Sequence, residues 1–345
     1  MVNTSKVAIV ILNWNGEKLF PDFLPSVIEN SSGKNIEIII ADNGSTDQSI
    51  SYLQKNFPSI KIIDLKENYG FAEGYNQALK QVDTDYFVLL NSDVKVSPNW
   101  IEPCISQFEN NEKIAAIQPK ILSYNNPDSF EYAGAAGGFI DLFGYPFCRG
   151  RILNQIEKDD NQYNETSQIF WASGACMFLR AEAFKNVGGL DGDFWAHMEE
   201  IDLCWRLKNS GSIINYEPKS VVYHLGGGTL SYDSPKKVYL NFRNNLFMLV
   251  KNLPKEQFKR IFITRLILDG VAAIKFLAGL NFNNFWAVVK AHISFYKNIS
   301  TLRKKRKEIQ KLNNIKTHPE IYTKSIMWKF FIQKKRKFSD LDFIS

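Results

Sequence analysis

The sequence has 345 residues, of which 45% are hydrophobic and 23% charged, so it can bury one large core together with a smaller additional region. Its four cysteines are widely scattered without CxxC spacing, which argues against a zinc site and a disulfide scaffold and predicts a reducing, cytoplasmic compartment. The net charge of +6 is uneven, because residues 251–345 carry 21 Lys and Arg against 6 Asp and Glu, whereas residues 1–250 carry 21 against 30.

The first hundred residues alternate strand-like and helix-like segments. Continuous apolar runs of β-type residues predict buried strands, and apolar residues at helical spacing predict helices between them. The predicted strands are 7–12, 36–41, 61–65 and 86–90, and the predicted helices are 17–30, 47–56 and 72–82. Ser45 or Thr46 is expected to cap the second helix. Such a βαβ series predicts a mostly parallel sheet flanked by helices, with a ligand crevice at the carboxyl ends of the strands.

The middle of the chain has weaker patterns. A helix is expected to open near Pro98, which is acceptable in a first helical turn, and residues 114–121 predict another strand. Residues 123–168 are rich in Gly, Asn, Pro and aromatic residues, and this composition predicts a loop-rich insertion. Regular structure is expected to resume at Phe170 and to continue in a helix over 199–210.

The chain beyond Tyr239 is apolar, basic and helical in pattern. Charges interrupt residues 261–280, and no window has eighteen uncharged apolar residues, so this segment is expected to lie on a membrane or pack on the body rather than span a bilayer. The first apolar run, 7–12, is too short for the core of a signal peptide. We therefore expect a peripheral protein whose basic end, from about Ile299 onward, contacts the anionic inner face of the cell membrane.

Alternatives for the basic end remain open. It could form a solvated coat on packed helices, and nucleic-acid binding is not expected because no recognisable module is present. Two cationic clusters, 303–307 and 334–337, lie among Trp328, Phe330 and Phe331.

Polar residues follow the predicted strands where each one ends. The stretches in question are Asn13-Trp14-Asn15-Gly16, Asp42-Asn43-Gly44-Ser45-Thr46-Asp47, Asn68-Tyr69-Gly70-Phe71-Ala72 and Asn91-Ser92-Asp93. Because the carboxyl ends of parallel strands meet at one edge of a sheet, carboxylates placed there predict a crevice for a nucleotide and a metal ion.

These four motifs, followed by Trp195-Ala196-His197-Met198-Glu199-Glu200-Ile201-Asp202 and by Val222-Tyr223-His224 with Gly226-Gly227-Gly228, resemble the family 2 glycosyltransferases of GT-A fold. The resemblance covers roughly residues 5–250 and is nearest to the rhamnosyltransferase-type branch of bacterial surface-polysaccharide synthesis. It implies a GT-A domain over 1–250, with a nucleotide-sugar half (1–122) and an acceptor half (123–250), and a helical basic region over 251–345.

The resemblance implies an inverting, metal-dependent enzyme that transfers a sugar from a UDP- or dTDP-sugar to a polysaccharide or lipid-linked acceptor. The donor-binding residues that it implies are Asn13, Asn15, Asp42, Asn43, Asn68, Gly70, Asn76, Asn91, Ser92, Asp93 and Arg243, with help from Asn244. Asp42 would contact the pyrimidine base, although a turn or helix-capping role is an alternative for it. Trp171, Ser173 and Gly174 fall where a sugar would pass, but Trp171 could equally belong to the core.

The resemblance also implies a divalent cation, Mn²⁺ or Mg²⁺, held by Asp93 and His224. A carboxylate-bound cation offsets charge on a leaving diphosphate, and a neutral imidazole is a competent ligand for Mn²⁺. Asn91 replaces the first Asp of the family's Asp-x-Asp pattern, which removes one anionic ligand. The glycines after His224 would permit a mobile lid.

A carboxylate cluster opens the helix over 199–210. Direct displacement at an anomeric carbon needs a base for the proton of the acceptor hydroxyl. The resemblance assigns Glu200 as this base and Glu199 as the residue that orients the acceptor, with Asp202 as the competing candidate. A structural role at the helix N-terminus is also open, because acids there are favoured by the helix dipole.

Two other classes of protein compete with this interpretation. A nucleotidyltransferase would carry a cationic glycine-rich loop after the first strand, whereas here no cation precedes Lys18. A non-catalytic nucleotide-binding or membrane-associated member of a polysaccharide-assembly complex is the main alternative, because Asn91 and Glu200 both depart from the family pattern.

Overall fold

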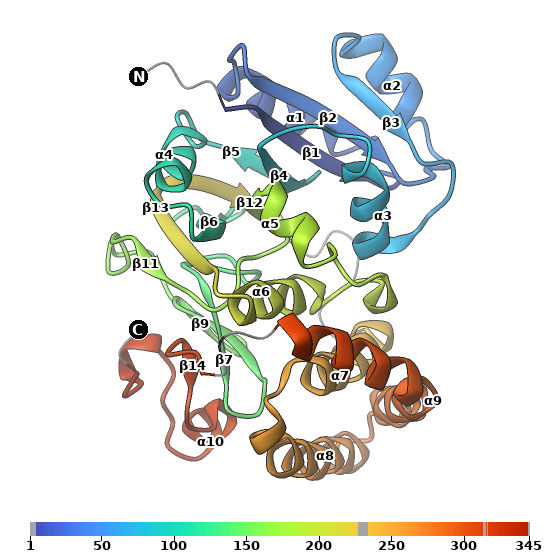
Figure 1. The fold of residues 1–345 in the computed structure, drawn as a ribbon, viewed down its shortest axis with the longest axis vertical. Helices are drawn as coiled ribbons and strands as arrows, with labels where there is room; N and C mark the ends of the chain where they lie inside the picture. Colours follow the sequence, from blue (N-terminus) through green and yellow to red (C-terminus); the bar gives the residue numbers. More distant parts are fainter. Residues whose placement is uncertain (1–4, 227–233, 313–314, 316, 344–345) are drawn as a thin grey trace.

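A computed structural model describes residues 5–226, 234–312, 315 and 317–343. Its main body is an α/β layer built on a nine-stranded sheet (Figure 1). The strands are β1 (Val7–Asn13), β2 (Ile36–Asp42), β3 (Lys61–Asp64), β4 (Tyr86–Asn91), β5 (Val94–Val96), β6 (Ile114–Ser123), β11 (Ser167–Gln168), β12 (Cys176–Arg180) and β13 (Ile213–His224). Their order is β11-β13-β6-β12-β4-β1-β2-β3, with β5 beside β13.

The strand pairing confirms the predicted α/β class. Strands β3, β2, β1 and β4 are parallel, and β12 runs antiparallel between β4 and β6, which makes the sheet mixed. The register aligns Asn13 with Asp42 and Asp42 with Asp64, so the polar ends of β1, β2 and β3 lie at one edge. This edge is where the sequence predicts a ligand crevice.

Helices flank the sheet, and further helices follow it in the chain. They are α1 (Phe20–Asn30), α2 (Ser49–Asn56), α3 (Gly70–Leu79), α4 (Glu102–Asn110), α5 (Ala181–Asn186), α6 (Glu199–Asn209), α7 (Pro235–Asn252), α8 (Lys255–Ala278), α9 (Phe282–Leu312) and α10 (Ile326–Phe331), with the short 3₁₀ turns η1 (Gly192–Phe194) and η2 (Phe338–Asp340). The predicted helices of the first hundred residues and of 199–210 are confirmed, with ends displaced by a few residues.

Two local predictions are wrong. The helix expected near Pro98 begins at Glu102, with a proline in its first turn. Ser45 and Thr46 do not cap α2, which begins at Ser49 without a side-chain cap. The hydroxyl of Ser45 instead accepts hydrogen bonds from the Asn15 backbone N–H (2.9 Å) and from Asn13 Nδ2 (3.1 Å), so it joins the loops that follow β1 and β2.

The insertion predicted as loop-rich over 123–168 contains part of a second sheet. Its strands are β7 (Gly138–Asp141), β8 (Pro146–Cys148), β9 (Arg151–Ile152) and β10 (Gln155–Ile156), and β14 (Ile321–Tyr322) completes it. Strands this short cannot establish a period of two in the sequence, which explains why composition predicts only loops there.

The C-terminal helices α7, α8 and α9 pack together below the sheet in Figure 1, and the chain then returns to the body. Strand β14 pairs in parallel with β7, and the rings of Phe338 and Phe343 each lie within 6.1 Å of the rings of Phe139 and Phe147. The end of the chain therefore closes the second sheet.

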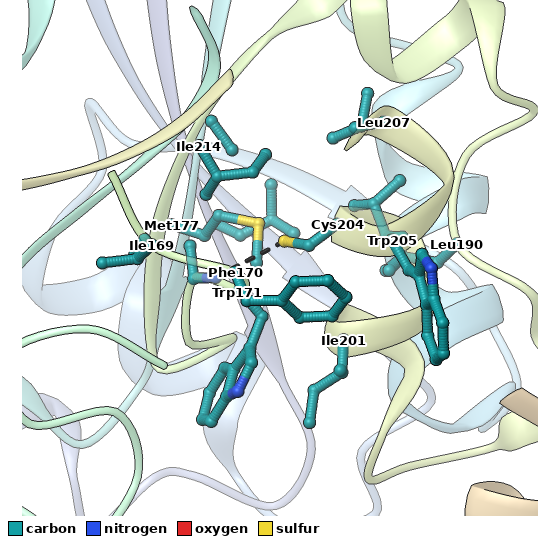
Figure 2. Packing of buried hydrophobic residues seen from close by; sticks show 14 of the residues in the cluster. Ile169, Phe170, Trp171, Met177, Leu190, Ile201, Cys204, Trp205, Leu207 and Ile214 are labelled. Atoms are coloured by element: carbon teal, nitrogen blue, oxygen red, sulfur yellow. Dashed lines mark hydrogen bonds between the residues drawn. The ribbon is translucent and has the colours of Figure 1, made fainter. Parts of the chain in front are cut away.

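A buried apolar cluster fixes helix α6 against the sheet. Figure 2 shows Phe170, Trp171, Ile201, Cys204 and Trp205 packed together, with the Ala172 backbone N–H 3.4 Å from Cys204 Sγ. This packing sets the position of the α6 N-terminus, which carries the predicted acid pair.

Candidate active site

The first group of site residues ties the ends of β1 and β2 together. Asn13 Nδ2 donates to Asp42 Oδ1 at 2.8 Å, and the Ser45 N–H donates to Asp42 Oδ2 at 2.9 Å. Both Asn13 and Asp42 are buried. Asp42 thus has the turn-forming role that the sequence left open, and its carboxylate is held rigidly at the sheet edge.

Asn15 makes a second tie between the same loops. Its backbone has φ of 55°, and its Oδ1 accepts from the backbone N–H groups of Thr46 (2.7 Å) and Asp47 (3.3 Å). A Cβ on the neighbouring Gly16 would lie 2.2 Å from Asn13 Oδ1, so only glycine permits this approach.

Asn43, Asn68 and Gly70 extend the network to the end of β3. Asn43 Nδ2 donates to the Gly70 carbonyl (2.9 Å), and Asn68 Oδ1 accepts from the Gly70 N–H (2.8 Å). Gly70 has φ of +75°, and a Cβ there would lie 2.6 Å from the indole of Trp195. Trp195, 39% exposed, therefore lies directly on the Gly70 backbone and offers an aromatic surface at this edge.

Two predicted donor-binding residues, Asn76 and Arg243, hydrogen-bond to the backbone of neighbouring loops. Asn76 uses both ends of its amide on Leu190, donating to its carbonyl (2.8 Å) and accepting from its N–H (3.0 Å). Arg243 donates to the carbonyls of Asp193 (3.0 Å) and Phe194 (2.9 Å). Direct contact of either residue with a donor stays a prediction.

The second group of site residues meets where β13 ends beside β5. The antiparallel register pairs His224 with Val94, and the Leu225 N–H donates to the Asp93 carbonyl at 3.0 Å. His224 Nε2 consequently lies 3.2 Å from Asp93 Oδ1 and 3.4 Å from Asn91 Nδ2. Ser92 lies between Asn91 and Asp93 in the chain, and its Oγ would be 3.7 Å from a Cβ on Gly16, a residue of the first group.

The Asp93–His224 pair fits a divalent cation as two neighbouring ligands. Adjacent corners of an octahedron with bonds of about 2.1 Å are separated by roughly 3 Å, close to the observed 3.2 Å between Oδ1 and Nε2. Within the part of the chain that the structure describes, no group of three or more His, Cys, Asp or Glu side chains is arranged to hold a metal. The remaining ligands would have to come from the donor and water. Gly227 and Gly228, where the sequence predicts a lid, lie outside the described residues.

Glu131 is a member of this group that the sequence did not reveal. This buried carboxylate has Oε2 3.2 Å from His224 Nδ1, so the imidazole lies between two carboxylates. Burial lowers the pKa of His224, but the close contacts with the carboxylates of Asp93 and Glu131 and their negative charges outweigh burial and raise it to about 10. Burial raises the pKa of Asp93, and the His224 contact more than offsets this and lowers it below its usual range.

The third group is the acid pair at the N-terminus of α6. Glu199 is buried and Glu200 partly buried, and within the described residues neither Oε2 atom has a hydrogen-bond partner. Burial raises the pKa of Glu200 to about 7. Burial, followed by the charge of Glu200, raises the pKa of Glu199 well above its usual range. A carboxylate with a pKa near neutrality is suited to accept a proton.

The acid pair lies next to the second group. A Cβ on Gly174 would be 4.0 Å from the Cβ of Glu200, and the Asn91 N–H donates to the carbonyl of Ala175 at 3.0 Å. Glu200 and Asn91 therefore flank the same two residues, Gly174 and Ala175, which directly precede β12. Trp171 and Ser173, by contrast, are buried in the core, where Trp171 Nε1 donates to the Phe139 carbonyl.

The segment before α6 has an unusual backbone. Trp195, His197 and Met198 all have positive φ, between 65° and 72°, which is costly for residues with side chains. Asn244 holds this turn by donating to the carbonyls of Phe194, Ala196 and His197 at 2.7–3.0 Å. The turn places the carbonyl of Trp195 at the N-terminus of α3, where it accepts from the N–H groups of Phe71 and Ala72. It also places the acid pair at the sheet edge.

Asp202 occupies a different environment from the acid pair. Its Oδ2 lies 2.8 Å from both Lys251 Nζ and Arg206 Nε, and its Oδ1 accepts from Asn252 Nδ2 at 2.8 Å. The residue has no solvent exposure. These contacts give Asp202 a role in joining α6 to α7, and they favour Glu200 over Asp202 as a base.

The fold is that of the GT-A glycosyltransferases. The crystal structure of GalNAc-T7 with UDP, GalNAc and Mn²⁺ has a TM-score of 0.63 at 16% identity, with 97% of this chain and 57% of that chain covered. TarS 1-349 of S. aureus with UDP-GlcNAc has a TM-score of 0.54 at 14% identity, with 88% and 92% covered. At these identities the likeness shows the fold alone.

The family is shown by sequence. The model of glycosyl transferase family 2 matches residues 8–188, and the chain belongs to this family. A relative is the N-acetylglucosaminyl-diphospho-decaprenol L-rhamnosyltransferase of Mycobacterium tuberculosis, 24% identical over 239 residues that make up 64% of this chain and 76% of the relative. Another is the low-salt glycan biosynthesis hexosyltransferase Agl10 of Haloferax volcanii, 22% identical over 279 residues, or 79% and 84% of the two chains.

These comparisons confirm the predicted family and the predicted class of enzyme. The protein is a glycosyltransferase of family 2, similar to a rhamnosyltransferase and to a hexosyltransferase of glycan biosynthesis.

Proposed function

We propose that this glycosyltransferase moves a sugar from a UDP- or dTDP-sugar to a polysaccharide or lipid-linked acceptor, with inversion and with the help of Mn²⁺ or Mg²⁺. The observation that carries the proposal is the meeting of two chemistries at one sheet edge. Asp93 and His224 are paired at 3.2 Å, and Glu200, with its raised pKa, flanks the same short segment as Asn91. Sugar transfer needs a cation site for the diphosphate of the donor and a base for the hydroxyl of the acceptor.

The strand-end network would bind the nucleoside. Asp42 is held by Asn13 and Ser45, and the Gly70 backbone is held by Asn43 and Asn68. Groups fixed before binding lose little conformational freedom when the donor arrives. The exposed ring of Trp195 above Gly70 would add a stacking surface.

Asp93 and His224 would hold the cation, which would displace the proton that the two carboxylates favour on the imidazole, and Asn91 would contribute a neutral amide beside them. A divalent cation there supplies positive charge against the charge that develops on the leaving diphosphate. Asp93 is anionic and buried, so its carboxylate is a strong local attraction for such an ion.

Glu200 would act as the base. As the acceptor oxygen attacks the anomeric carbon, its proton passes to the Glu200 carboxylate while the bond from that carbon to the diphosphate oxygen breaks on the opposite side. Attack and departure on opposite faces invert the configuration. Glu199 lies next to it, and its raised pKa favours the protonated form, which would donate a hydrogen bond that orients the acceptor.

A thermal-shift panel tests the donor site. UDP, dTDP, GDP, CDP and ADP are each added with and without Mn²⁺. A nucleotide at about one hundred times its Kd stabilises the protein by about 2.7 kcal/mol. We expect a metal-dependent shift with UDP or dTDP that is absent in Asp93→Ala and retained in Glu112→Gln, which changes an exposed carboxylate before β6, at the other edge of the sheet.

The same preparation separates an enzyme from a non-catalytic relative. Slow, metal-dependent hydrolysis of the shifted donor sugar is expected of the wild type. A metal-dependent shift without any hydrolysis or transfer would favour the non-catalytic alternative, and no shift with any nucleotide would contradict the proposed donor class.

A further inference from the structure

The outward side of α8 is apolar. Ile263, Ile267, Val271 and Ile274 follow one another at spacings of four, four and three residues, which places them on one face of the helix. Their exposed fractions are 47%, 62%, 57% and 66%. Large aliphatic side chains exposed in a row of this kind mark a surface that meets a partner.

Helix α9 has a similar stripe. Phe282, Trp286, Ile293 and Tyr296 share one face, with exposed fractions between 50% and 55%. The two helices are joined by the short turn over 279–281 and run antiparallel, with Phe262 beside Phe295, so both stripes run from this turn along one helical hairpin (Figure 1). We call these eight residues the outer face of the hairpin.

The opposite sides of both helices are already occupied. Asp269 on α8 is buried, and its carboxylate contacts Arg265 Nε (2.7 Å) and His292 Nε2 of α9 (3.2 Å). Phe295 is fully buried against Phe247 of α7. Each helix thus has apolar residues both toward the protein and away from it. Apolar residues all round a helix indicate burial on both sides, and within the described residues only the inner side has a partner.

Helix α10 continues this surface beyond α8. Lys275 Nζ lies 4.8 Å from the centre of the Phe331 ring, which joins the two helices. Trp328 and Ile332 are each 58% exposed. Arg336, 3.9 Å above the Phe330 ring, and Lys275 line a cavity of about 590 Å³ at the same junction.

Cations lie at the other end of the hairpin. Helix α8 begins with exposed Lys255, Lys259 and Arg260, and α9 ends with exposed Lys304 and Lys307 among further basic residues. Because the helices are antiparallel, these ends lie together. The surface is therefore apolar and aromatic toward the turn and basic at the opposite end of the hairpin. This arrangement is expected where a helix pair lies in the headgroup region of an anionic bilayer.

We propose that the outer face of the hairpin, with Trp328 and Ile332 of α10, seats on an anionic phospholipid bilayer. This rests on the proposed function, in which a lipid-linked acceptor lies at a membrane, and it extends the contact predicted after Ile299 back to the apolar faces of α8 and α9. A second copy of the chain fits this face less well. Residues 251–345 carry 21 Lys and Arg against 6 Asp and Glu, so a dimer through this face would bring two strongly positive regions together, and they would repel each other.

Truncation at Ile299 is an unsuitable test, since it removes buried Leu302 and Ile309 and the strand β14. We instead compare full-length variants by co-sedimentation with vesicles, without nucleotide or acceptor, so that the result does not depend on the transferase activity. The vesicles are pure phosphatidylcholine, or phosphatidylcholine with about 30% phosphatidylglycerol.

Ile267→Ser with Ile274→Ser should lower binding to the anionic vesicles by at least about tenfold, whereas Ile267→Leu with Ile274→Leu should retain it. Lys304→Glu with Lys307→Glu should lower it by a similar factor and reduce its salt dependence. Lys34→Glu with Lys55→Glu, exposed cations on the opposite end of the body, is the matched control and should bind like the wild type.

The proposal is overturned if the serine variant binds anionic vesicles as well as the wild type does, or if binding to pure phosphatidylcholine is equally strong. It is also overturned if the wild type dimerises and the serine variant does not, because the face would then seat a second copy. A donor-induced thermal shift retained in the serine variant shows that it is folded and leaves the transferase assignment independent of this result.

Discussion

Glu131 Oε2 lies 3.2 Å from Nδ1 of His224, on the side of the imidazole opposite to Asp93. A carboxylate in this position fixes the orientation of a histidine ring and increases the basicity of its other nitrogen. Glu131 itself is held in place, because it is buried and accepts a hydrogen bond from the Ala133 N–H. It is therefore a positioning residue for the proposed cation site.

Glu131→Gln should weaken Mn²⁺ binding by about 10- to 100-fold, since the ring loses its anionic partner. Titration of free Mn²⁺ by electron paramagnetic resonance, with nucleotide present, measures this without catalysis. The matched control is Glu217→Gln, which changes a different buried carboxylate, one that lies on β13. Unchanged Mn²⁺ affinity in Glu131→Gln would assign Glu131 to the fold rather than to the cation.

Asp202 provides a second prediction, about stability. It binds Lys251, Arg206 and Asn252 in the protein interior, and Lys251 also lies 2.5 Å from Asp191. Asp202→Asn leaves buried Arg206 without its charge partner and Lys251 with Asp191 alone, and it should lower the free energy of unfolding by about 3 kcal/mol. Chemical denaturation measures this change.

Glu37→Gln removes one partner of an exposed pair with Lys61 and should change stability by less than about 1 kcal/mol. If Asp202→Asn is as stable as the wild type yet loses transfer, the base belongs at Asp202 instead of Glu200.

The first hundred residues could be predicted closely from sequence because β1, β2 and β4 are buried on both faces and therefore have continuous apolar runs. The polar residues after each strand then had to meet at one edge. Asn13, Asp42 and Asn43 do so, in a network of hydrogen bonds that the motifs alone did not specify.

Glu131 could not be predicted, because it lies in an irregular segment and reaches His224 only through the pairing of β13 with β5 and β6. The strained turn at Trp195 had no sequence signal either, since positive φ usually requires glycine or asparagine. Ser45 was assigned wrongly as a cap because a hydroxyl next to a helix start has the same local pattern whether it bonds to the helix or to a neighbouring loop.

A third prediction concerns the pH dependence of stability. The raised pKa of Glu199 means that the folded state holds a proton that the unfolded state loses above about pH 4.5. Its contribution to stability is complete below that pH and is lost as pH rises toward the folded pKa. Glu199→Gln should therefore gain Tm relative to the wild type on going from pH 5 to pH 8. A difference in Tm that is constant over this range would contradict the raised pKa.

The last prediction concerns Glu200 and the rate of transfer. A base must be deprotonated to act, and burial raises the pKa of Glu200 to about 7, so kcat/KM should rise with pH and level off above about pH 8. Glu200→Gln should lower kcat by about 100-fold or more, with the nucleotide-induced thermal shift retained. Glu200→Asp should retain measurable transfer, because it keeps a carboxylate although its arm is one methylene shorter. If Glu200→Gln keeps the wild-type rate and pH profile, the proton goes to a different group. Glu199 and Glu200 would then only form part of the acceptor-binding surface.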